Sequence, residues 1–460
     1  MNKTVNMTRG KPLRLMLFFA LPLMIGNAFQ QMYIVVDTAI VGRGVGMSAL
    51  AALGTVDWLN WMFIGIAQGF TQGFSVKIAQ KFGEGDGGGV RRTVAKCVRL
   101  SAVIAVVGEI FAQLALPLFL MILRVPEELW GTAELYSRII MGGFPVVVFF
   151  NCCSAVLRAV GDSKTPLVAM LAASATNVVL DLVTVFPLGL GVAGAAGATV
   201  FSQLLAGVVC AWRITKTPAL RFSRDQLKGD RELERELMKM GLPMAVKNII
   251  ISVGGIAVQS VVNGFSMSFI AGFTATNKLF GILDIAAISY GYAVTTYIGQ
   301  NYGARLFDRI RRGMKTAVIL SIVTSLVIGA LMLVFGRPIT MLFISEEDPA
   351  LVAAAADTAY NYLSVMSVCL PILYLLYAFM AALQGLGDTV SPMISGIIEF
   401  FMRVSVSLAI GFTGFENGIF ASEVLAWLGA TVYMFIMYKR TSSRVLDDKK
   451  SSHTLKGKKV

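Results

Sequence analysis

The hexapeptide GDSKTP at residues 161–166 returns as GDTVSP at residues 387–392, an offset of 226. Three further pairs keep the same order along the chain: Pro145 with Pro371, IAQKFG (78–83) with IGQNYG (298–303), and Leu21–Pro22 with Leu242–Pro243. Four matches in one order indicate that the two halves of the chain are copies of one structural unit.

The composition predicts a membrane protein. Of the 460 residues, 56% are hydrophobic and only 15% are charged, with a mean hydropathy of +0.71. A soluble protein needs more charge to cover its surface. Apolar segments long enough for transmembrane helices recur twelve times: 14–41, 50–80, 97–121, 134–157, 166–187, 191–213, 238–262, 270–299, 315–336, 352–383, 392–412 and 416–438. They lack the alternation of a transmembrane β-barrel.

The number of helices per copy predicts the symmetry. Six helices is an even number, so the second copy enters the membrane in the same direction as the first. We therefore expect an all-α integral membrane protein with two six-helix bundles, related by a pseudo-twofold axis along the membrane normal. The expected parts are an N-terminal bundle with a cation site (1–213), a basic cytoplasmic linker (214–237), a C-terminal bundle (238–440) and a basic cytoplasmic tail (441–460).

The net charge is +13, and most of the basic residues that cause it lie on one side of the membrane in this topology. Basic residues are dense around Arg91 and Arg92, through the linker 214–237 and in the tail 441–460. If the helices alternate, all these regions lie on the same side, and the positive-inside rule makes that side cytoplasmic. We expect a monomer in a bacterial cytoplasmic membrane with both termini inside. The placement explains the basic excess without a nucleic-acid partner.

The sequence lacks the residues that several kinds of catalytic and metal site require. The five cysteines show no metal-ligand spacing, and the one histidine, His453, lies in the tail. A zinc site or a serine–histidine pair in the membrane is therefore not expected. No Walker A motif is present, so ATP is not the direct energy source. We expect neither an enzyme nor a cofactor.

Asn177 and Asp181 interrupt an apolar helix, four residues apart and on one face. A charge at the bilayer centre costs about 2.5–3.5 kcal/mol on insertion scales, so such a residue usually faces a bundle interior or a watery cavity. At a rise of about 1.5 Å per residue, Asp181 lies about 22 Å beyond Pro166. Thr199, about 12 Å into the next helix from its other end, lies at nearly the same depth.

The first helix carries a second polar stripe, because Gln30, Tyr33 and Asp37 are spaced i, i+3, i+7. Together the two stripes and Thr199 supply carboxylate, amide, hydroxyl and phenol oxygens. This set suits Na⁺, or two acids that share one proton. The alternative is a buried polar network that only holds helices together.

Other charged residues lie inside the predicted helices. Asp284 and Glu109 are mid-helix acids that we consider for a substrate cavity, together with Arg403. Glu399 lies one helical turn before Arg403, so a structural pair between them is expected. The seventh predicted helix (238–262) has no acid, which argues against a second cation site in the C-terminal half.

The chain resembles the multidrug and toxic compound extrusion (MATE) transporters over nearly its whole length, and within them the bacterial DinF-like branch. The similarity is carried by QQMYIVVDTAIVG in the first helix, GDSKTP, and NVVLD followed by GAAGAT. It implies a cation site confined to the N-terminal half. The residues that the resemblance assigns to it are Asp37, Asn177, Asp181 and Thr199, which would be metal ligands if Na⁺ is the coupling ion.

The expected function is secondary active efflux of small organic, often cationic and amphipathic compounds, driven by an inward H⁺ or Na⁺ gradient. The two bundles would alternate access to the two sides of the membrane. The main alternative is a lipid-linked oligosaccharide flippase of the same superfamily, for which a more basic cavity would be expected. A membrane-embedded enzyme has little support, because no nucleophile–base pair is recognisable.

Overall fold

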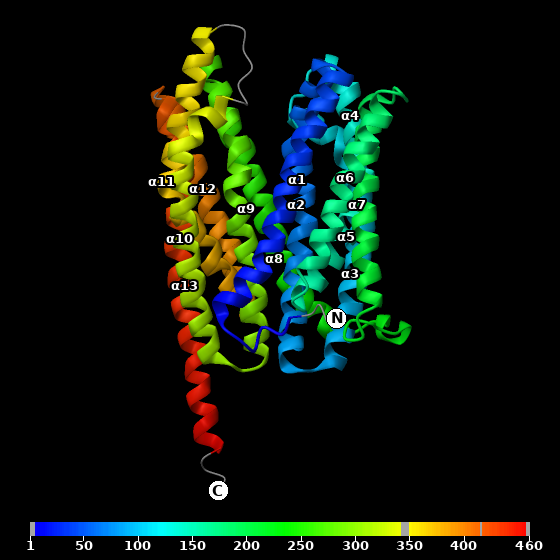
Figure 1. The fold of residues 1–460 in the computed structure, drawn as a ribbon, viewed down its shortest axis with the longest axis vertical. Helices are drawn as coiled ribbons and strands as arrows, with labels where there is room; N and C mark the ends of the chain where they lie inside the picture. The colour runs from blue at the N-terminus through cyan, green and yellow to red at the C-terminus, as the bar shows by residue number, and fades with distance from the viewer. Residues whose placement is uncertain (1–4, 342–348, 415, 457–460) are drawn as a thin grey trace. The chain divides into compact units, whose positions relative to one another are not determined.

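The computed structural model describes residues 5–341, 349–414 and 416–456. Within these ranges the protein is helical and contains no β-strand (Figure 1). Eleven helices are long and apolar enough to cross a membrane, and α4 and α5 together make a twelfth, bent span. The all-helical, twelve-span prediction is therefore confirmed.

The chain folds into two compact units, and unit 1 consists of residues 5–6 and 18–252. Its elements are α1 (Pro12–Gly44), α2 (Met47–Glu84), α3 (Gly87–Ile122), α4 (Glu127–Gly142), α5 (Phe144–Ala159), α6 (Lys164–Val185), α7 (Gly191–Thr215), η1 (Arg224–Leu227) and the first part of α8 (Arg231–Val262). Within it α6 packs against α7, and α5 packs against α2, α3 and α7.

Unit 2 consists of residues 7–17 and the described residues from 253 onward. Its elements are the start of α1, the end of α8, α9 (Met267–Gly303), α10 (Phe307–Met341), α11 (Pro349–Gly385), α12 (Val390–Thr413), η2 (Glu416–Ile419) and α13 (Phe420–Lys456). Here α11 packs against α9, α10 and α13, and α12 packs against α13.

The boundaries between the two units lie inside α1 and α8, whereas the sequence predicts a boundary in the linker 214–237. For α8 the reason is a glycine ridge on α2, formed by Gly65, Gly69 and Gly73. A Cβ on Gly69 would lie 2.5 Å from the backbone of Ala245, and one on Gly73 would lie 2.4 Å from the carbonyl oxygen of Met240. Only glycine allows the two helices to approach this closely.

The first residues of the chain belong to unit 2 because the repeated motif at 298–303 holds their backbone. The Met7 N–H donates to Gln300 Oε1 at 2.8 Å, and Asn301 Nδ2 donates to the Met7 carbonyl at 3.1 Å. Arg309 adds hydrogen bonds to the carbonyls of Met7 and Gly10, each at 3.0 Å. A backbone segment without a helical partner is thus satisfied by buried side chains.

The two hexapeptide loops have the same structure. Asp162 accepts hydrogen bonds from the N–H and hydroxyl of Thr165 at 3.0 and 2.8 Å. Asp388 accepts the same pair from Ser391 at 2.9 and 2.6 Å. The preceding glycine has a positive φ in both loops, 84° and 94°. Each loop therefore satisfies one of the free N–H groups at the start of its helix, which explains the repeated sequence.

The fourth span is bent by 41° between α4 and α5. Pro145 near the start of α5 has no N–H to donate into the preceding turn. Gly143, at the break, is covered by α7, because a Cβ there would lie 2.5 Å from Val200. The single apolar segment predicted at 134–157 is thus a pair of shorter helices.

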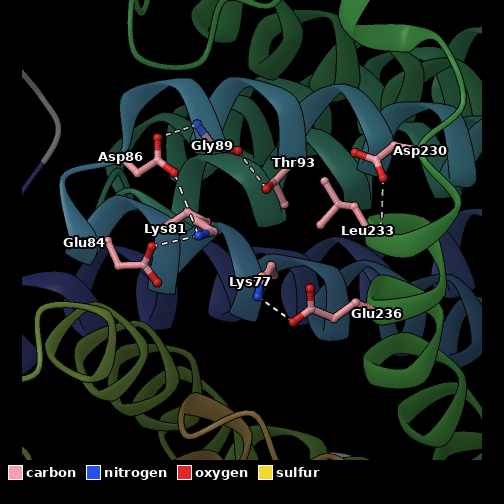
Figure 2. A network of polar contacts seen from close by, with 9 residues as sticks. All are labelled: Lys77, Lys81, Glu84, Asp86, Gly89, Thr93, Asp230, Leu233 and Glu236. Carbon is pink, nitrogen blue, oxygen red and sulfur yellow. Dashed lines mark hydrogen bonds and ion pairs between the residues drawn. The ribbon is translucent and has the colours of Figure 1, made fainter.

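Figure 2 shows a polar network at the end of unit 1 where α2, α3 and α8 begin or end. Lys81 on α2 forms ion pairs with Glu84 at 2.8 Å and Asp86 at 3.8 Å. One turn earlier, Lys77 forms an ion pair with Glu236 on α8. These contacts tie the start of α8 to unit 1 in addition to the glycine ridge.

Candidate functional site

The polar stripe of α6 points into unit 1. Asp181 has no exposed surface and Asn177 is only 1% exposed, while apolar neighbours such as Val179 lie on the exposed face. Asn177 Nδ2 donates a hydrogen bond to Thr199 Oγ1 on α7 at 3.3 Å. The sequence predicts Asp181 and Thr199 at nearly the same depth, and the residue of α6 that Thr199 contacts is Asn177, one turn before Asp181.

The stripe of α1 lies beside the stripe of α6. Tyr33 is half-buried, its hydroxyl is hydrogen-bonded to Gln30, and it lies within electrostatic reach of Asp37 and Asp181. The carboxyl groups of Asp37 and Asp181 are themselves within hydrogen-bonding distance of each other. The structure thus brings Gln30, Tyr33, Asp37 and Asp181 together with Asn177 and Thr199, the six residues chosen from the sequence.

The contact between Asp37 and Asp181 has a chemical requirement. Among the described residues, no donor lies within hydrogen-bonding distance of Asp181 Oδ1 or Oδ2, or of Asp37 Oδ1. Two ionised carboxylates can only accept, so a hydrogen bond between them needs a proton on one of them. Without a proton or a cation, the pair would place two like charges together in a buried site.

The oxygens of this site fit a hard cation. Asn177 Oδ1 is also buried without a donor in the described structure, which adds a neutral oxygen to the carboxylate oxygens. Oxygen-only sets of this kind suit Na⁺ and do not suit a soft metal. Over the described part of the chain, no group of three or more His, Cys, Asp or Glu is arranged to hold a metal ion. The chemistry of these oxygens thus suits a proton or a monovalent cation.

Sequence reasoning missed Tyr136 on α4. This largely buried tyrosine lies within electrostatic reach of Asp37, Asp181 and Tyr33, and it packs against the apolar cluster that contains Val185. Nothing near Tyr136 in the sequence signals this, because the contact depends on how α4 packs against neighbouring helices. Ser174 was also missed, although it lies one turn before Asn177 on the same stripe and could have been found by helical spacing.

Of the residues considered for a substrate cavity, Glu109 belongs to unit 1, whereas Asp284 and Arg403 belong to unit 2. Glu109 accepts a hydrogen bond from Gln113 at 3.0 Å, and Gln113 also contacts Arg138 on α4. Asp284 accepts a hydrogen bond from the Tyr377 hydroxyl at 3.0 Å. Both acids therefore have structural contacts within their own unit.

The structure adds a partner to the expected pair of Glu399 with Arg403. Arg403 Nη2 donates to Glu423 Oε2 on α13 at 2.7 Å, and this is its direct ion pair. Glu399 lies within electrostatic reach of Arg403 and accepts a hydrogen bond from the Ser395 hydroxyl at 3.5 Å. Packing of α12 against α13 brings Glu423 to the guanidinium, and helical spacing alone could not show this.

Comparison with known proteins is consistent with this architecture. The probable multidrug resistance protein YoeA of Bacillus subtilis is 29% identical over 364 residues, 76% of this chain and 78% of its own. The probable multidrug resistance protein YpnP of the same organism is 28% identical over 400 residues, covering 87% of this chain and 88% of its own. The structure of a MOP superfamily transporter from Pyrococcus furiosus has a TM-score of 0.90 at 23% identity, with 97% and 99% of the two chains covered. At that identity the likeness shows the fold.

The model of the MatE family matches residues 22–183 and 243–408. These two ranges include both hexapeptide loops and make up well over half of the chain. The protein therefore belongs to the MatE family of membrane transporters and is not an enzyme.

Proposed function

We propose that the protein is a secondary active exporter of small organic compounds, driven by an inward gradient of H⁺ or Na⁺. The observation that carries the proposal is the contact between the fully buried Asp181 and the half-buried Asp37, in which Asp181 Oδ1 and Oδ2 and Asp37 Oδ1 have no hydrogen-bond partner among the described residues. A pair of this kind is unfavourable unless it holds a proton or a cation. It therefore supports a site that loads and unloads an ion during transport.

The coupling follows from the charge on this pair. When Asp37 and Asp181 hold one proton or one Na⁺, their repulsion is relieved and the site can remain closed to water. When the ion leaves, the exposed negative charge favours a conformation in which water reaches the carboxylates. Ion binding would thus bias the equilibrium between states open to opposite sides, and alternating access converts the ion gradient into efflux.

The proposed substrates are organic, often cationic and amphipathic. YoeA and YpnP are both named as probable multidrug resistance proteins, which supports small organic substrates. The chain also has 23 Met and 29 Phe, residues whose apolar side chains adapt to ligands of different shape.

The test is transport by purified protein in liposomes, with a fluorescent organic cation as substrate. A proton gradient or a Na⁺ gradient is imposed alone, and the initial transport rate is measured per inserted molecule. We expect one gradient to drive transport, and we expect Asp181→Asn to lower the driven rate by about tenfold or more, since coupling energies of about 1–3 kcal/mol are typical. Asn keeps the shape but cannot titrate or supply a full negative charge. Thermal stability in detergent should be unchanged or higher.

Asp225→Asn is the matched control, because Asp225 lies exposed on η1, away from the carboxyl pair. It should transport at the parental rate. A stable Asp181→Asn protein with parental rate and ion dependence would contradict the proposed site. Dye transport that needs neither gradient, together with movement of a fluorescent lipid-linked sugar, would favour the flippase alternative.

A further inference from the structure

The internal repeat places α12 of unit 2 where unit 1 has α6. At the offset of 226, Asn177 corresponds to Arg403 and Asp181 to Ser407. The two hexapeptide loops cap their helices in the same way, so the helices start in the same register. Unit 2 thus carries a guanidinium and a hydroxyl at the positions that provide an amide and a carboxylate in unit 1.

Arg403 is held by acids of its own unit. Its side chain is 10% exposed, and that of its ion-pair partner Glu423 is 16% exposed, with 2.7 Å between Nη2 and Oε2. Glu399, one turn earlier on α12, lies within electrostatic reach of the same guanidinium. In unit 1 Asn177, the residue that corresponds to Arg403, instead donates a hydrogen bond to Thr199 on α7. The same place in the repeat therefore holds a neutral contact in one unit and an ion pair in the other.

Aromatic rings pack beside this ion pair. Tyr362 is 1% exposed and lies within electrostatic reach of both Arg403 and Glu423. Its ring stacks on Phe273 at 5.0 Å and on Phe420 at 4.7 Å between centroids. Such a cluster leaves little room for water or an exchanging ion on this side of the pair.

We propose that Arg403 is a resident cation that occupies, in unit 2, the position of the ion site of unit 1. An arginine keeps its charge in proteins, so Glu423 and Glu399 face a cation that can never be released. The carboxyl pair Asp37 and Asp181 must instead obtain its proton or Na⁺ from solution. Residue 403 would thereby determine that each molecule has one exchangeable ion site. This inference rests on the proposed function for unit 1.

The test counts bound ions in an Asp181→Asn background, in which unit 1 keeps only the Asp37 carboxyl group and contributes the same exchange to every variant compared. Purified protein is assayed for binding of radioactive sodium and for protons taken up when a weakly buffered sample is acidified. Arg403→Asn, which installs the unit 1 residue, should add one bound cation or proton per molecule over Asp181→Asn alone, because Glu423 then loses the guanidinium of its ion pair. Adding Glu423→Gln to that double variant should remove the gain, and Arg403→Lys should give none.

Two results would overturn the proposal. One is a folded, monodisperse Asp181→Asn, Arg403→Asn protein that binds no more ions than Asp181→Asn. The other needs no change at Arg403 and decides the matter if that variant fails to fold. This result is that the Asp181→Asn protein still binds an ion and that adding Glu423→Gln abolishes this binding. Unit 2 would then exchange ions although Arg403 is present. Both comparisons concern residues of unit 2. They can therefore be interpreted even if Asp181→Asn leaves transport unchanged and the proposed function fails.

Discussion

The side chain of Asp181 is completely buried, and the carboxyl group of Asp37 lies against it. Stability does not explain this arrangement, because replacing buried charged groups by neutral ones of similar shape is often neutral or stabilising. Ion exchange gives the two acids a reason to be where they are. The same reasoning works from sequence alone, since a carboxylate in an apolar helix is costly wherever its partner lies.

Other parts of the site could not be read from the sequence at the residue scale. Spacing along one helix found Gln30, Tyr33 and Asp37, because their stripe needs only the helical period. Tyr136 and the Arg403–Glu423 pair depend on how two helices pack. The rotation of one helix against another is set by side-chain packing across the whole interface, and no local pattern encodes it.

Tyr136→Phe tests the residue that the sequence did not reveal. The ring and its packing against the Val185 cluster remain, while the hydroxyl near both carboxyl groups is lost. A polar contact of this kind is worth about 1 kcal/mol, so we expect the apparent ion affinity in the liposome assay to fall by about fivefold. Thermal stability should change little.

Tyr433→Phe on α13 is the control for that experiment, because it removes the same hydroxyl from a membrane helix of unit 2. Its ion dependence should equal that of the parent. An unchanged ion affinity in Tyr136→Phe would exclude the hydroxyl from the ion site and leave the tyrosine as a packing residue.

At the scale of elements, hydropathy predicts where the helices lie in the sequence, but it does not predict which unit each helix packs into. Hydropathy located all twelve spans, but the bend between α4 and α5 depends on Gly143, Pro145 and the contact with Val200. Likewise, the glycines of α2 are spaced by four residues in the sequence, yet only the structure shows that α8 packs on them.

Gly69→Ala should destabilise the contact between α2 and α8. The added Cβ would lie 2.5 Å from the backbone of Ala245, and a helix backbone cannot give way as a side-chain tip can. Overpacking of this kind typically costs about 1–3 kcal/mol, so the melting temperature in detergent should fall by several degrees. Gly54→Ala, on the same helix with no neighbour within 4 Å of the new Cβ, should not lower it. Equal stability of the two variants would contradict the close packing.

The two capping loops allow a matched comparison between the repeats. Asp388→Ala removes the cap of α12 and should cost about 1 kcal/mol. Asp162→Ala removes the equivalent cap of α6 and also the acceptor of Arg213 Nε at 3.3 Å, so its loss of thermal stability should be larger. The measurement is the melting temperature of each variant beside the parent. A larger loss for Asp388→Ala would mean that the ion pair with Arg213 contributes nothing.

At the scale of the whole molecule, the distribution of charge and the number of crossings constrain each other. The start of α3 and the connection from α7 to α8 are both basic, with Arg91 and Arg92 exposed in the first and Lys228 exposed in the second. Between them lie α3, the bent pair α4–α5, α6 and α7, which is an even number of crossings only if the bent pair crosses once. The positive-inside rule and the single bent span thus support each other.

Cysteine labelling in intact cells tests the predicted cytoplasmic side and the single crossing of α4–α5 in one experiment. We expect little labelling of the parent protein, because its native cysteines are shielded. Four are buried and one is half-buried: Cys97, Cys152, Cys153 and Cys210, and Cys369. We expect a membrane-impermeant maleimide to label Glu128→Cys, which is exposed at the start of α4, one crossing away from the basic side.

Arg92→Cys and Lys228→Cys should react with the same reagent only after the membrane is permeabilised, because both lie on the basic side that the rule makes cytoplasmic. The two sites must behave alike if α4 and α5 form one span, since four crossings separate them. Labelling of Lys228→Cys in intact cells while Arg92→Cys stays protected would mean an odd number of crossings. The bent pair would then cross twice or not at all, and six helices per repeat, on which the parallel orientation of the two copies depends, would have to be given up.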